Sequence, residues 1–515
     1  MGLLLWVQEV QEGESGRDGC GGEGENAEGH QAKTGGGDRI CEGGGIGGTM
    51  RRIYLDWGVV SYLKKDEYAE LRDLFLSNKD RLFFVYSPAH LEDLMKSKDE
   101  PQFDDDIKLL SDLVYDHLLD IDKGAVLPYR VTPEEFCQGY VDHFSELSQD
   151  IDSFLSVIDA ALIPSDNTVN QIKANLNVAF PIPPEFRSNE VFARTLPNLP
   201  ESPTVKDVVE SVRQFMCDMM MNPGAYKDYR RVIGDTGFKL EKNAGNWEDE
   251  VAVDRINSFL KSQGIEMEFN DYVMQSFHGR KASANEFFTA AYCILDMLGF
   301  HSDKLPKATN TIRSVTSDAR HAYFAGFCDW FVTADTRLTH KAKALYSHFG
   351  VSTRVMTPME AVSAIQEEIR PWGQNYILSF IESEFIPEHI EERHDKENDS
   401  DADFLIYRLS RRFLGLFSHG IHYLYSNGSA TLQFKLAFDN YSRFLFYDEV
   451  GMIVDTITRY FGLEGISEYE FLRKKFVEGK TDVTISWRMD NGFVCVKNDE
   501  ERLRPELYFV FYPNG

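Results

Sequence analysis

The chain has 515 residues, of which 43% are hydrophobic and 13% aromatic, and this composition excludes an intrinsically disordered protein. Its formal net charge of −29 excludes nucleic-acid binding by overall attraction, so phosphate contacts require a local excess of Lys and Arg. No stretch approaches the roughly 18 unbroken apolar residues of a membrane span, and the seven cysteines form no CxxC pair. These features predict a cytoplasmic protein with no membrane partner.

The first 49 residues differ from the rest of the chain because they are rich in glycine and acidic residues, with almost nothing apolar after Val10. Such a segment cannot bury enough apolar surface to offset its ordering entropy. Met50 stands directly before RRIYLDWG, which is a clear strand start. We therefore expect residues 1–49 to be a disordered or non-native extension and Met50 to be the natural initiator.

Residues 50–100 and 310–368 alternate between predicted strands and helices. In the first part, RRIYLDW and RLFFVYSP are predicted strands, residues 59–78 have apolar side chains at helical spacing, and AHLEDLMKS follows Pro88 as a helix. In the second part, SDARHAYFAGFC, DWFVTAD, RLTHKAKALYSHFG, VSTRVMT and MEAVSAIQEEI read as helix, strand, helix, strand and helix. This order predicts one α/β domain with a parallel sheet flanked by helices.

Residues 101–309 are predicted to be a large helical insertion that splits this domain. Amphipathic segments recur there: DDDIKLLSDLVYDHLLDI, FSELSQDIDSFLSVIDAAL, TVKDVVESVRQFMCDMMM and ANEFFTAAYCILDMLGF. Residues 371–515 are predicted to be an α+β C-terminal module, with a charged patch, a helix-like stretch after it, and two hairpins around Asn427-Gly428 and Asn491-Gly492. This module is the predicted place for a protein partner or a homo-oligomer contact.

Four acidic residues are predicted to meet at one edge of the sheet. Asp56 and Asp335 each end a predicted strand, Asp318 begins the helix before the second of these strands, and Glu92 lies one turn into another helix. Loops converge at the carboxyl edge of a parallel sheet, which is where ligands bind. Clustered carboxylates repel one another and favour a hard divalent cation, so Mg²⁺ or Mn²⁺ is the expected cofactor. Two such ions about 4 Å apart can activate water against a phosphodiester.

The run SDARHAYFAGFCDWFVTADTRLTHKA, followed by a strand and VMTPMEA, resembles the C-terminal half of PIN and PIN-like nuclease domains. IYLDWGVVSYLKK resembles the opening strand–Asp–helix motif of that family, and SPAHLEDLMKS resembles its Glu-bearing helix. The resemblance covers about 50–100 and 310–365. It implies that Asp56, Glu92, Asp318 and Asp335 are the catalytic, metal-binding acids, and it matches Thr333 to the threonine before the last acid. The implied activity is a metal-dependent endonuclease, with RNA expected ahead of DNA, leaving 5′-phosphate and 3′-hydroxyl ends.

Thr333, Arg337 and Lys341 are the predicted substrate-binding residues, since they lie beside the last acid. Arg337 and Lys341 also belong to a local basic excess, with eight Lys or Arg against five Asp or Glu between residues 301 and 360. Such an excess is the local exception that an acidic chain needs in order to meet phosphates.

Two alternatives stay open. A helix puts Glu92 and Asp93 about 100° apart, so only one of them can face the site, and His321 is interpreted as a hydrogen-bonded helix histidine and not as a ligand. In addition, Gly58 stands where PIN domains commonly have Asn. This departure favours a second hypothesis, a catalytically degenerate PIN-like protein that acts as a protein-interaction or nucleic-acid-sensing module.

Overall fold

The structure is a computed structural model, and it describes residues 51–512 with gaps. The longer gaps are residues 140–177, 183–191, 303–311, 369–375, 395–401 and 436–446, and shorter ones of one to six residues occur elsewhere. The predicted extension 1–49 and the amphipathic segment FSELSQDIDSFLSVIDAAL therefore lie outside the described residues. No helix in the described part is both long and apolar enough to cross a lipid bilayer.

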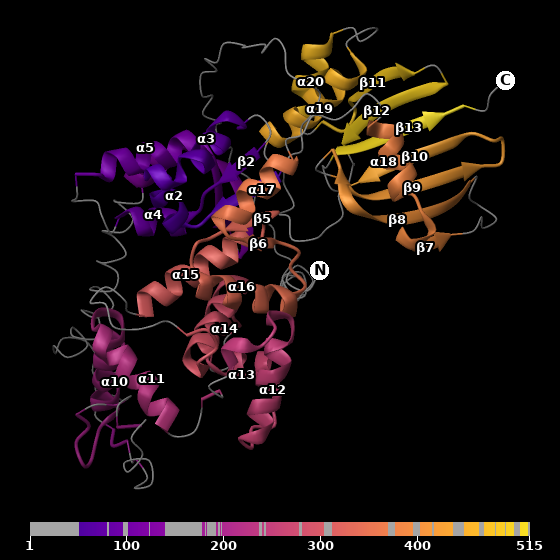
Figure 1. Ribbon diagram of the computed structural model, residues 1–515. Coiled ribbons are helices and arrows are strands. Elements are labelled where there is room, and N and C mark those ends of the chain that lie inside the picture. The colour runs from indigo at the N-terminus through magenta and orange to yellow at the C-terminus, as the bar shows by residue number, and fades with distance from the viewer. Residues whose placement is uncertain are drawn as a thin grey trace, which may run out of the picture. The chain divides into compact units, whose positions relative to one another are not determined.

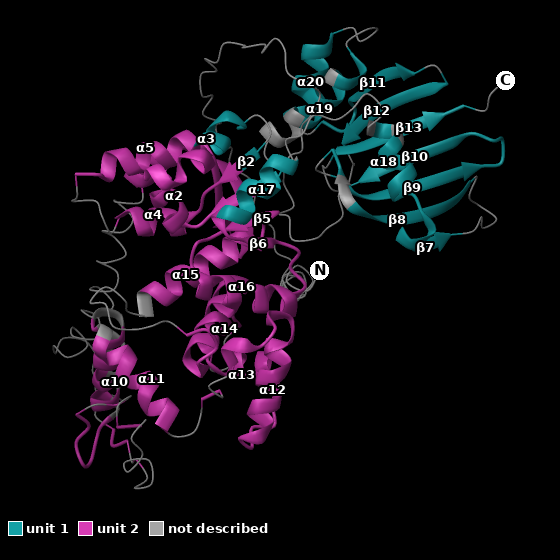
Figure 2. Ribbon diagram, viewed as in Figure 1, with its two compact units in different colours: residues 1–52, 73–83, 359–515 teal, residues 53–72, 84–358 magenta. Residues whose placement is uncertain are grey.

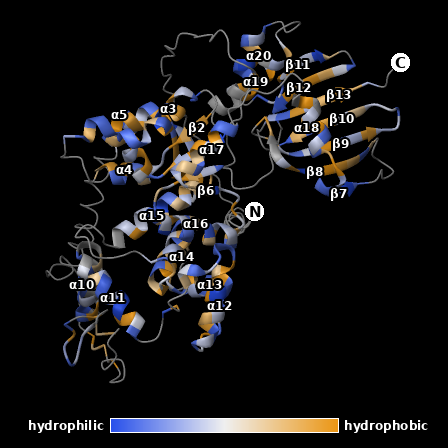
Figure 3. Ribbon diagram, in the orientation of Figure 1, coloured by the Kyte–Doolittle hydropathy of each residue, from blue (hydrophilic) through white to orange (hydrophobic). Residues whose placement is uncertain are grey.

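The chain divides into two compact units (Figure 2). One consists of residues 53–72 and 84–358, and the other is mainly residues 359–515. Hydrophobic residues run along the strands and along one side of many helices (Figure 3), as expected when each element buries one face against its neighbours.

A four-stranded sheet of order β2-β1-β5-β6 carries the predicted site. Figure 1 labels β2, β5 and β6 of this sheet. The strands are β1 (Arg51–Leu55), β2 (Leu82–Val85), β5 (Trp330–Val332) and β6 (Arg354–Met356). β1 pairs in parallel with β5, with Leu55 opposite Val332, and β5 pairs in parallel with β6. Nearly every strand residue is buried, which is typical of a parallel sheet covered on both faces. The predicted mixed α/β fold with a parallel sheet is confirmed.

Helices alternate with these strands: α2 (Trp57–Tyr62), α3 (Ala69–Ser77), α4 (Pro88–Met95), α15 (Ile312–Ala325), α16 (Thr336–Phe349) and α17 (Pro358–Glu368). Pro88 and Pro358 occupy the first helical position of α4 and α17, where a missing N–H costs nothing. Gly350 ends α16 in the left-handed conformation. Residues 59–78 do not form one helix, because a short 3₁₀ turn at Asp66–Tyr68 separates α2 from α3.

Along the chain, the segment between β2 and β5 forms mainly helices. They are α5 (Phe103–Val114), α10 (Val205–Met221), α11 (Pro223–Asp235), α12 (Ala252–Ser262), α13 (Phe269–Gln275) and α14 (Ala284–Leu298). The segment DDDIKLLSDLVYDHLLDI was expected to be helical throughout, and this is wrong for its second half. α5 ends at Val114, Tyr115 has a left-handed φ of 59°, and β3 (His117–Asp122) pairs with β4 (Ala125–Arg130). Short apolar runs such as HLLDI fit a strand as well as a helix.

The C-terminal unit contains a seven-stranded antiparallel sheet of order β11-β12-β13-β10-β9-β8-β7. Its strands are β7 (Ile390–His394), β8 (Ala402–Phe413), β9 (Phe417–Tyr425), β10 (Ala430–Lys435), β11 (Thr484–Met489), β12 (Gly492–Asn498) and β13 (Pro505–Phe511). Both predicted hairpins form, as β9–β10 and β11–β12. The helix-like stretch after the charged patch is instead β8, because buried Tyr407 and Leu409 alternate with exposed Arg408 and Ser410.

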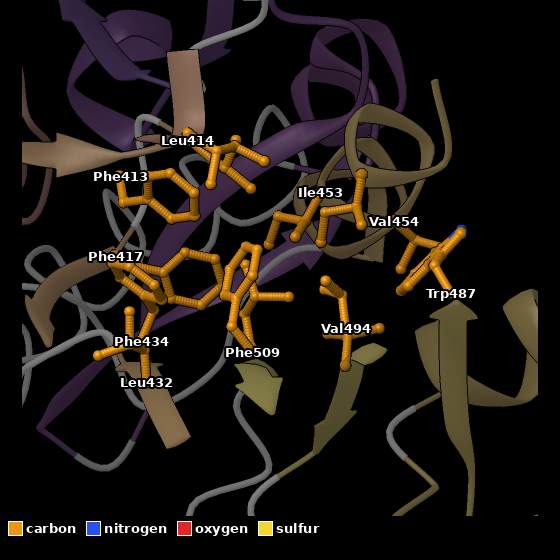
Figure 4. Close-up of a cluster of buried hydrophobic side chains, with 14 of the residues drawn as sticks. Phe413, Leu414, Phe417, Leu432, Phe434, Ile453, Val454, Trp487, Val494 and Phe509 are labelled. Atoms are coloured by element: carbon orange, nitrogen blue, oxygen red, sulfur yellow. The ribbon is translucent and has the colours of Figure 1, made fainter. Parts of the chain in front are cut away.

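Helices α18 (Tyr376–Glu384), α19 (Tyr447–Phe461) and α20 (Tyr469–Val477) complete this unit. Side chains from the sheet and from these helices form a common hydrophobic cluster (Figure 4). At its centre the rings of Phe413 and Phe434 stack with centroids 4.2 Å apart, and Phe509 meets Phe434 edge-on. Buried aromatic pairs of this kind stabilise beyond their area alone.

Candidate functional site

Asp56 and Asp335 follow the two central strands of the parallel sheet, β1 and β5, and Thr333 links them. The Thr333 hydroxyl donates to Asp56 Oδ2 at 3.0 Å and accepts from the Asp335 backbone N–H at 3.1 Å. Thr333 is fully buried, and its hydrogen bond to Asp56 is shielded from water. The ladder continues past the strands, since the Asp56 N–H donates to the Val332 carbonyl. The threonine therefore fixes one acid side chain against the main chain of the other.

The two acids use their carboxylates differently, although each occupies a helix N-cap position. Asp335 caps α16, and its Oδ1 accepts from the backbone N–H groups of Arg337 and Leu338. Asp56 precedes α2 but makes no side-chain cap bond. An N-cap aspartate ordinarily binds the free amides of its helix, so the Asp56 carboxylate is held by Thr333 at the expense of its own helix.

Burial raises the pKa of the Asp56 carboxyl above its ordinary value. The neighbouring carboxylates of Asp93 and Asp335 raise this pKa further, whereas His321 and the hydrogen bond from Thr333 lower it. The contributions of Asp93 and Asp335 mean that three carboxylates lie close enough to interact.

Asp93 of α4 contributes to the raised pKa of Asp56. One Asp93 oxygen accepts from the Ser317 hydroxyl at 2.8 Å, and the other lies 3.0 Å from His321 Nε2. Because an ionised carboxylate only accepts hydrogen bonds, His321 donates from Nε2. Both donors come from α15, so this helix fixes the orientation of Asp93.

A series of buried side-chain hydrogen bonds continues from Asp93 through His321 and Tyr54 to Ser87. His321 Nδ1 lies 2.9 Å from the Tyr54 hydroxyl, which lies 2.6 Å from the Ser87 hydroxyl. Burial raises the pKa of Tyr54 well above its ordinary value, so the phenol stays neutral. The prediction that His321 is a hydrogen-bonded helix histidine is confirmed, since both ring nitrogens have partners within the protein.

His90 is also buried, and its ring lies against those of Tyr54 and His321. Its imidazole is neutral. Its Nδ1 accepts from the Ser87 N–H at 3.1 Å, which leaves Nε2 to donate to the Leu55 carbonyl at 2.7 Å. Burial lowers the pKa of His90 to about 3. His90 therefore ties α4 to the end of β1, one residue before Asp56, and does not exchange protons near neutral pH.

Glu92 and Asp318 are placed differently from the sequence prediction. Glu92 forms an ion pair with Arg320 of α15, so its carboxylate is already matched by a cation. Asp318 does not begin α15 as expected, since the helix starts at Ile312, and it lies mid-helix and half-buried. Among the described residues, the four predicted acids do not form a cluster with metal-ligand spacing.

The predicted substrate-binding residues separate into three environments. Thr333 is buried between the acids, Arg337 is half-buried in the first turn of α16, and Lys341 is fully buried. Lys341 Nζ lies 3.1 Å from Asp296 Oδ1 and 4.5 Å from the centre of the Tyr292 ring. A substrate phosphate cannot reach Lys341, so that prediction is wrong.

Gly58 lies beside the Asp56 carboxylate. A Cβ atom at this position would stand 3.2 Å from Asp56 Oδ2, which is tighter than ordinary van der Waals contact. The glycine therefore leaves room for the Thr333–Asp56 hydrogen bond, and an Asn there would crowd the carboxylate.

The described residues do contain one group with metal-ligand spacing, formed by Asp249, His301 and His340. One donor atom from each lies within 4.8 Å of the others. No sequence motif indicates this group, because its three residues are spread over about ninety positions. Asp93 was left open in the sequence as the alternative to Glu92. Tyr54 was missed, although it lies two residues before Asp56.

Comparison of the chain with protein-family models, with curated proteins and with solved structures found no match. Functional inference therefore depends on the residues of this chain alone.

Proposed function

We propose that the carboxyl edge of β1 and β5 binds Mg²⁺ or Mn²⁺ and that the protein is a PIN-like endonuclease that hydrolyses phosphodiester bonds of RNA. The observation that carries this proposal is the double hydrogen bond of Thr333, which joins Asp56 to Asp335 across neighbouring parallel strands. The PIN-like sequence blocks supply the expected substrate and reaction.

The donor set fits a hard cation. Among the described residues, Thr333 is the one side-chain donor to Asp56, and it uses Oδ2; the α16 amides use Oδ1 of Asp335. Each carboxylate therefore keeps a second oxygen for another partner, and carboxylate oxygens are the ligands that Mg²⁺ and Mn²⁺ prefer. A cation would also offset the repulsion from Asp93 and Asp335, which adds to burial in raising the pKa of Asp56.

A bound divalent ion supplies an activated water and charge neutralisation at a phosphodiester. The residues of the chain hold the carboxylates in place. Thr333 and the α16 amides hold Asp56 and Asp335, while Ser317 and His321 hold Asp93, which adds negative charge beside them. Asp318 remains a proposed further ligand. Glu92 acts as a ligand only if it leaves Arg320, so we assign it a structural role ahead of a catalytic one.

The test is Mn²⁺-dependent cleavage of a panel of single-stranded and structured RNAs by the full chain. Asp335→Asn is the informative variant, because Asn caps helices as well as Asp does and the fold is retained. The matched control is Asp66→Asn, which removes the same charge from the exposed turn before α3. We expect Asp335→Asn to lose activity and Asp66→Asn to keep it. No metal-dependent cleavage by the wild-type chain, or cleavage that survives Asp335→Asn, would refute the proposal.

A catalytically degenerate PIN-like module is the second candidate, and the fate of the basic residues favours it. Arg320 is paired with Glu92 and Lys341 with Asp296, so two members of the local basic excess are used within the protein. Calorimetric titration with Mn²⁺ separates the candidates. If the site is a nuclease site, the wild type binds Mn²⁺ and Asp56→Asn abolishes this binding. If the site is degenerate, no Mn²⁺ binding that depends on Asp56 is observed.

A further inference from the structure

Asp249, His301 and His340 come from three separate segments of the same unit. Asp249 opens a short 3₁₀ helix (Asp249–Val251), His301 follows the end of α14, and His340 lies in the second turn of α16. Three elements thus bring a carboxylate and two imidazoles together. None of the three belongs to the acidic site at the sheet edge.

The contacts within this group leave one nitrogen unused. His340 Nδ1 lies 2.9 and 3.1 Å from the two Asp249 oxygens, and the His301 ring stacks on the His340 ring with centroids 3.8 Å apart. His301 Nε2 is buried and has no hydrogen-bond partner among the described residues. Leaving a buried polar atom unpaired costs about 1–3 kcal/mol, and native proteins contain few such atoms. In its Nδ1-protonated form, this imidazole offers an electron pair at Nε2.

We propose that Asp249, His301 and His340 bind a transition-metal ion of the zinc class. Two imidazoles and a carboxylate are a common zinc donor set, and three protein ligands leave a fourth position for water. Tetrahedral bonds of about 2.0–2.2 Å space the donor atoms about 3.4 Å apart. The donors lie within 4.8 Å of one another, so binding requires small rotations that open the stack of imidazoles.

The donor atoms select the kind of ion. Mg²⁺ prefers oxygen ligands, so a site with two imidazole nitrogens and one carboxylate disfavours it. Nitrogen donors instead favour Zn²⁺, Co²⁺ or Ni²⁺. The buried Nε2 of His301, which has no hydrogen-bond partner among the described residues, is available to such an ion.

The proposed ion would link α16 to two neighbouring elements. His340 lies five residues after Asp335, which is about 7.5 Å along the helix and about 140° around it. The metal group therefore lies on a different side of α16 from the acid at its N-terminus. Its three ligands would fasten this helix to the end of α14 and to the 3₁₀ helix, and so help to hold the helix that presents Asp335.

The test is titration of the full chain, freed of metal by a chelator, with Co²⁺ and then Zn²⁺. We expect one equivalent of Co²⁺ to bind with the visible absorption of a tetrahedral site and to be displaced by Zn²⁺. Loss of a ligand in His301→Gln or His340→Gln should weaken binding by about 100-fold or more. The matched control is His348→Gln on the same helix, whose ring binds Asn270 and which should leave Co²⁺ binding unchanged.

Two further variants make every outcome decisive. If His340→Gln fails to fold by circular dichroism, Asp249→Asn and His301→Gln decide, because each removes a ligand from another element. Asp56→Asn should keep Co²⁺ binding while losing the Mn²⁺ response, so failure at one site is distinguishable from failure at the other. The absence of stoichiometric Co²⁺ binding in the wild type, or equal binding in the ligand variants, overturns the proposal.

Discussion

Thr333→Val is the sharpest structural test of the sheet edge. Valine has nearly the same shape as threonine but carries no hydroxyl, so the variant removes the hydrogen bond to Asp56 and the one from the Asp335 N–H without opening a cavity. Both bonds measure about 3 Å, and the bond to Asp56 is shielded from water because Thr333 is fully buried.

The expected loss follows from these two bonds. A hydrogen bond to a charged group contributes about 1.5–3 kcal/mol and a neutral one about 0.5–1.5 kcal/mol. Thr333→Val should therefore lower the free energy of unfolding by about 2–4 kcal/mol. Thr333→Ser keeps the hydroxyl and loses one methyl group, which costs about 1 kcal/mol. A larger loss of unfolding free energy in Thr333→Val than in Thr333→Ser shows that hydrogen bonding contributes more than packing of the methyl group.

Urea denaturation followed by circular dichroism measures both variants, with the slope of the transition checked for equality. If Thr333→Val is as stable as Thr333→Ser, the hydroxyl does not hold the two acids together and the reasoning is wrong. Mn²⁺ titration of the folded variants then reports whether the acids still bind an ion.

Three further predictions concern charge and space. Burial raises the folded-state pKa of Asp56, so stability from this group is present at low pH and lost as pH rises through that pKa. Asp56→Asn should therefore raise the melting temperature at pH 7 without divalent ions, and the gain should vanish towards pH about 4. A scan of melting temperature against pH in chelator measures this. Lys341→Met removes one cation from Asp296, which keeps Arg230 and Tyr226 as partners. Urea denaturation should show a free energy of unfolding lower by about 3 kcal/mol, and the KM for RNA should stay unchanged. A Cβ at Gly492 would lie 1.8 Å from the Val510 carbonyl oxygen, so Gly492→Ala should cost about 3 kcal/mol or more; an unchanged melting curve would contradict the strand pairing.

The strands and most helices were predictable because their signals are local. Buried runs such as LFFV, proline at helix starts and Gly350 after α16 act within a few residues. The β3–β4 hairpin was not predictable, since HLLDI is too short to show its period. β8 was missed because three consecutive apolar residues, Phe404 to Ile406, hide its alternation.

The composition of the acidic site could be predicted only in part, because the deciding partners are remote in sequence. Asp56 and Asp335 follow from strand ends, but the choice between Asp93 and Glu92 depends on Ser317, His321 and Arg320 of α15. Lys341 looked exposed within a polar helix, and its burial follows from Asp296. An aspartate inside the apolar run ILDML is the signal that a buried cation was needed.

The pairing of β1 with β5 has a consequence for synthesis on the ribosome. Asp56 and Thr333, which meet at the end of these strands, are separated by 277 positions. At about 5–20 residues per second, translation reaches Thr333 about 15–55 s after Asp56. During that interval the nascent β1 lacks its central neighbour and exposes apolar surface that a chaperone can recognise. A chain released early carries Asp56 without Asp335, so any activity of the edge is withheld until translation has passed α16.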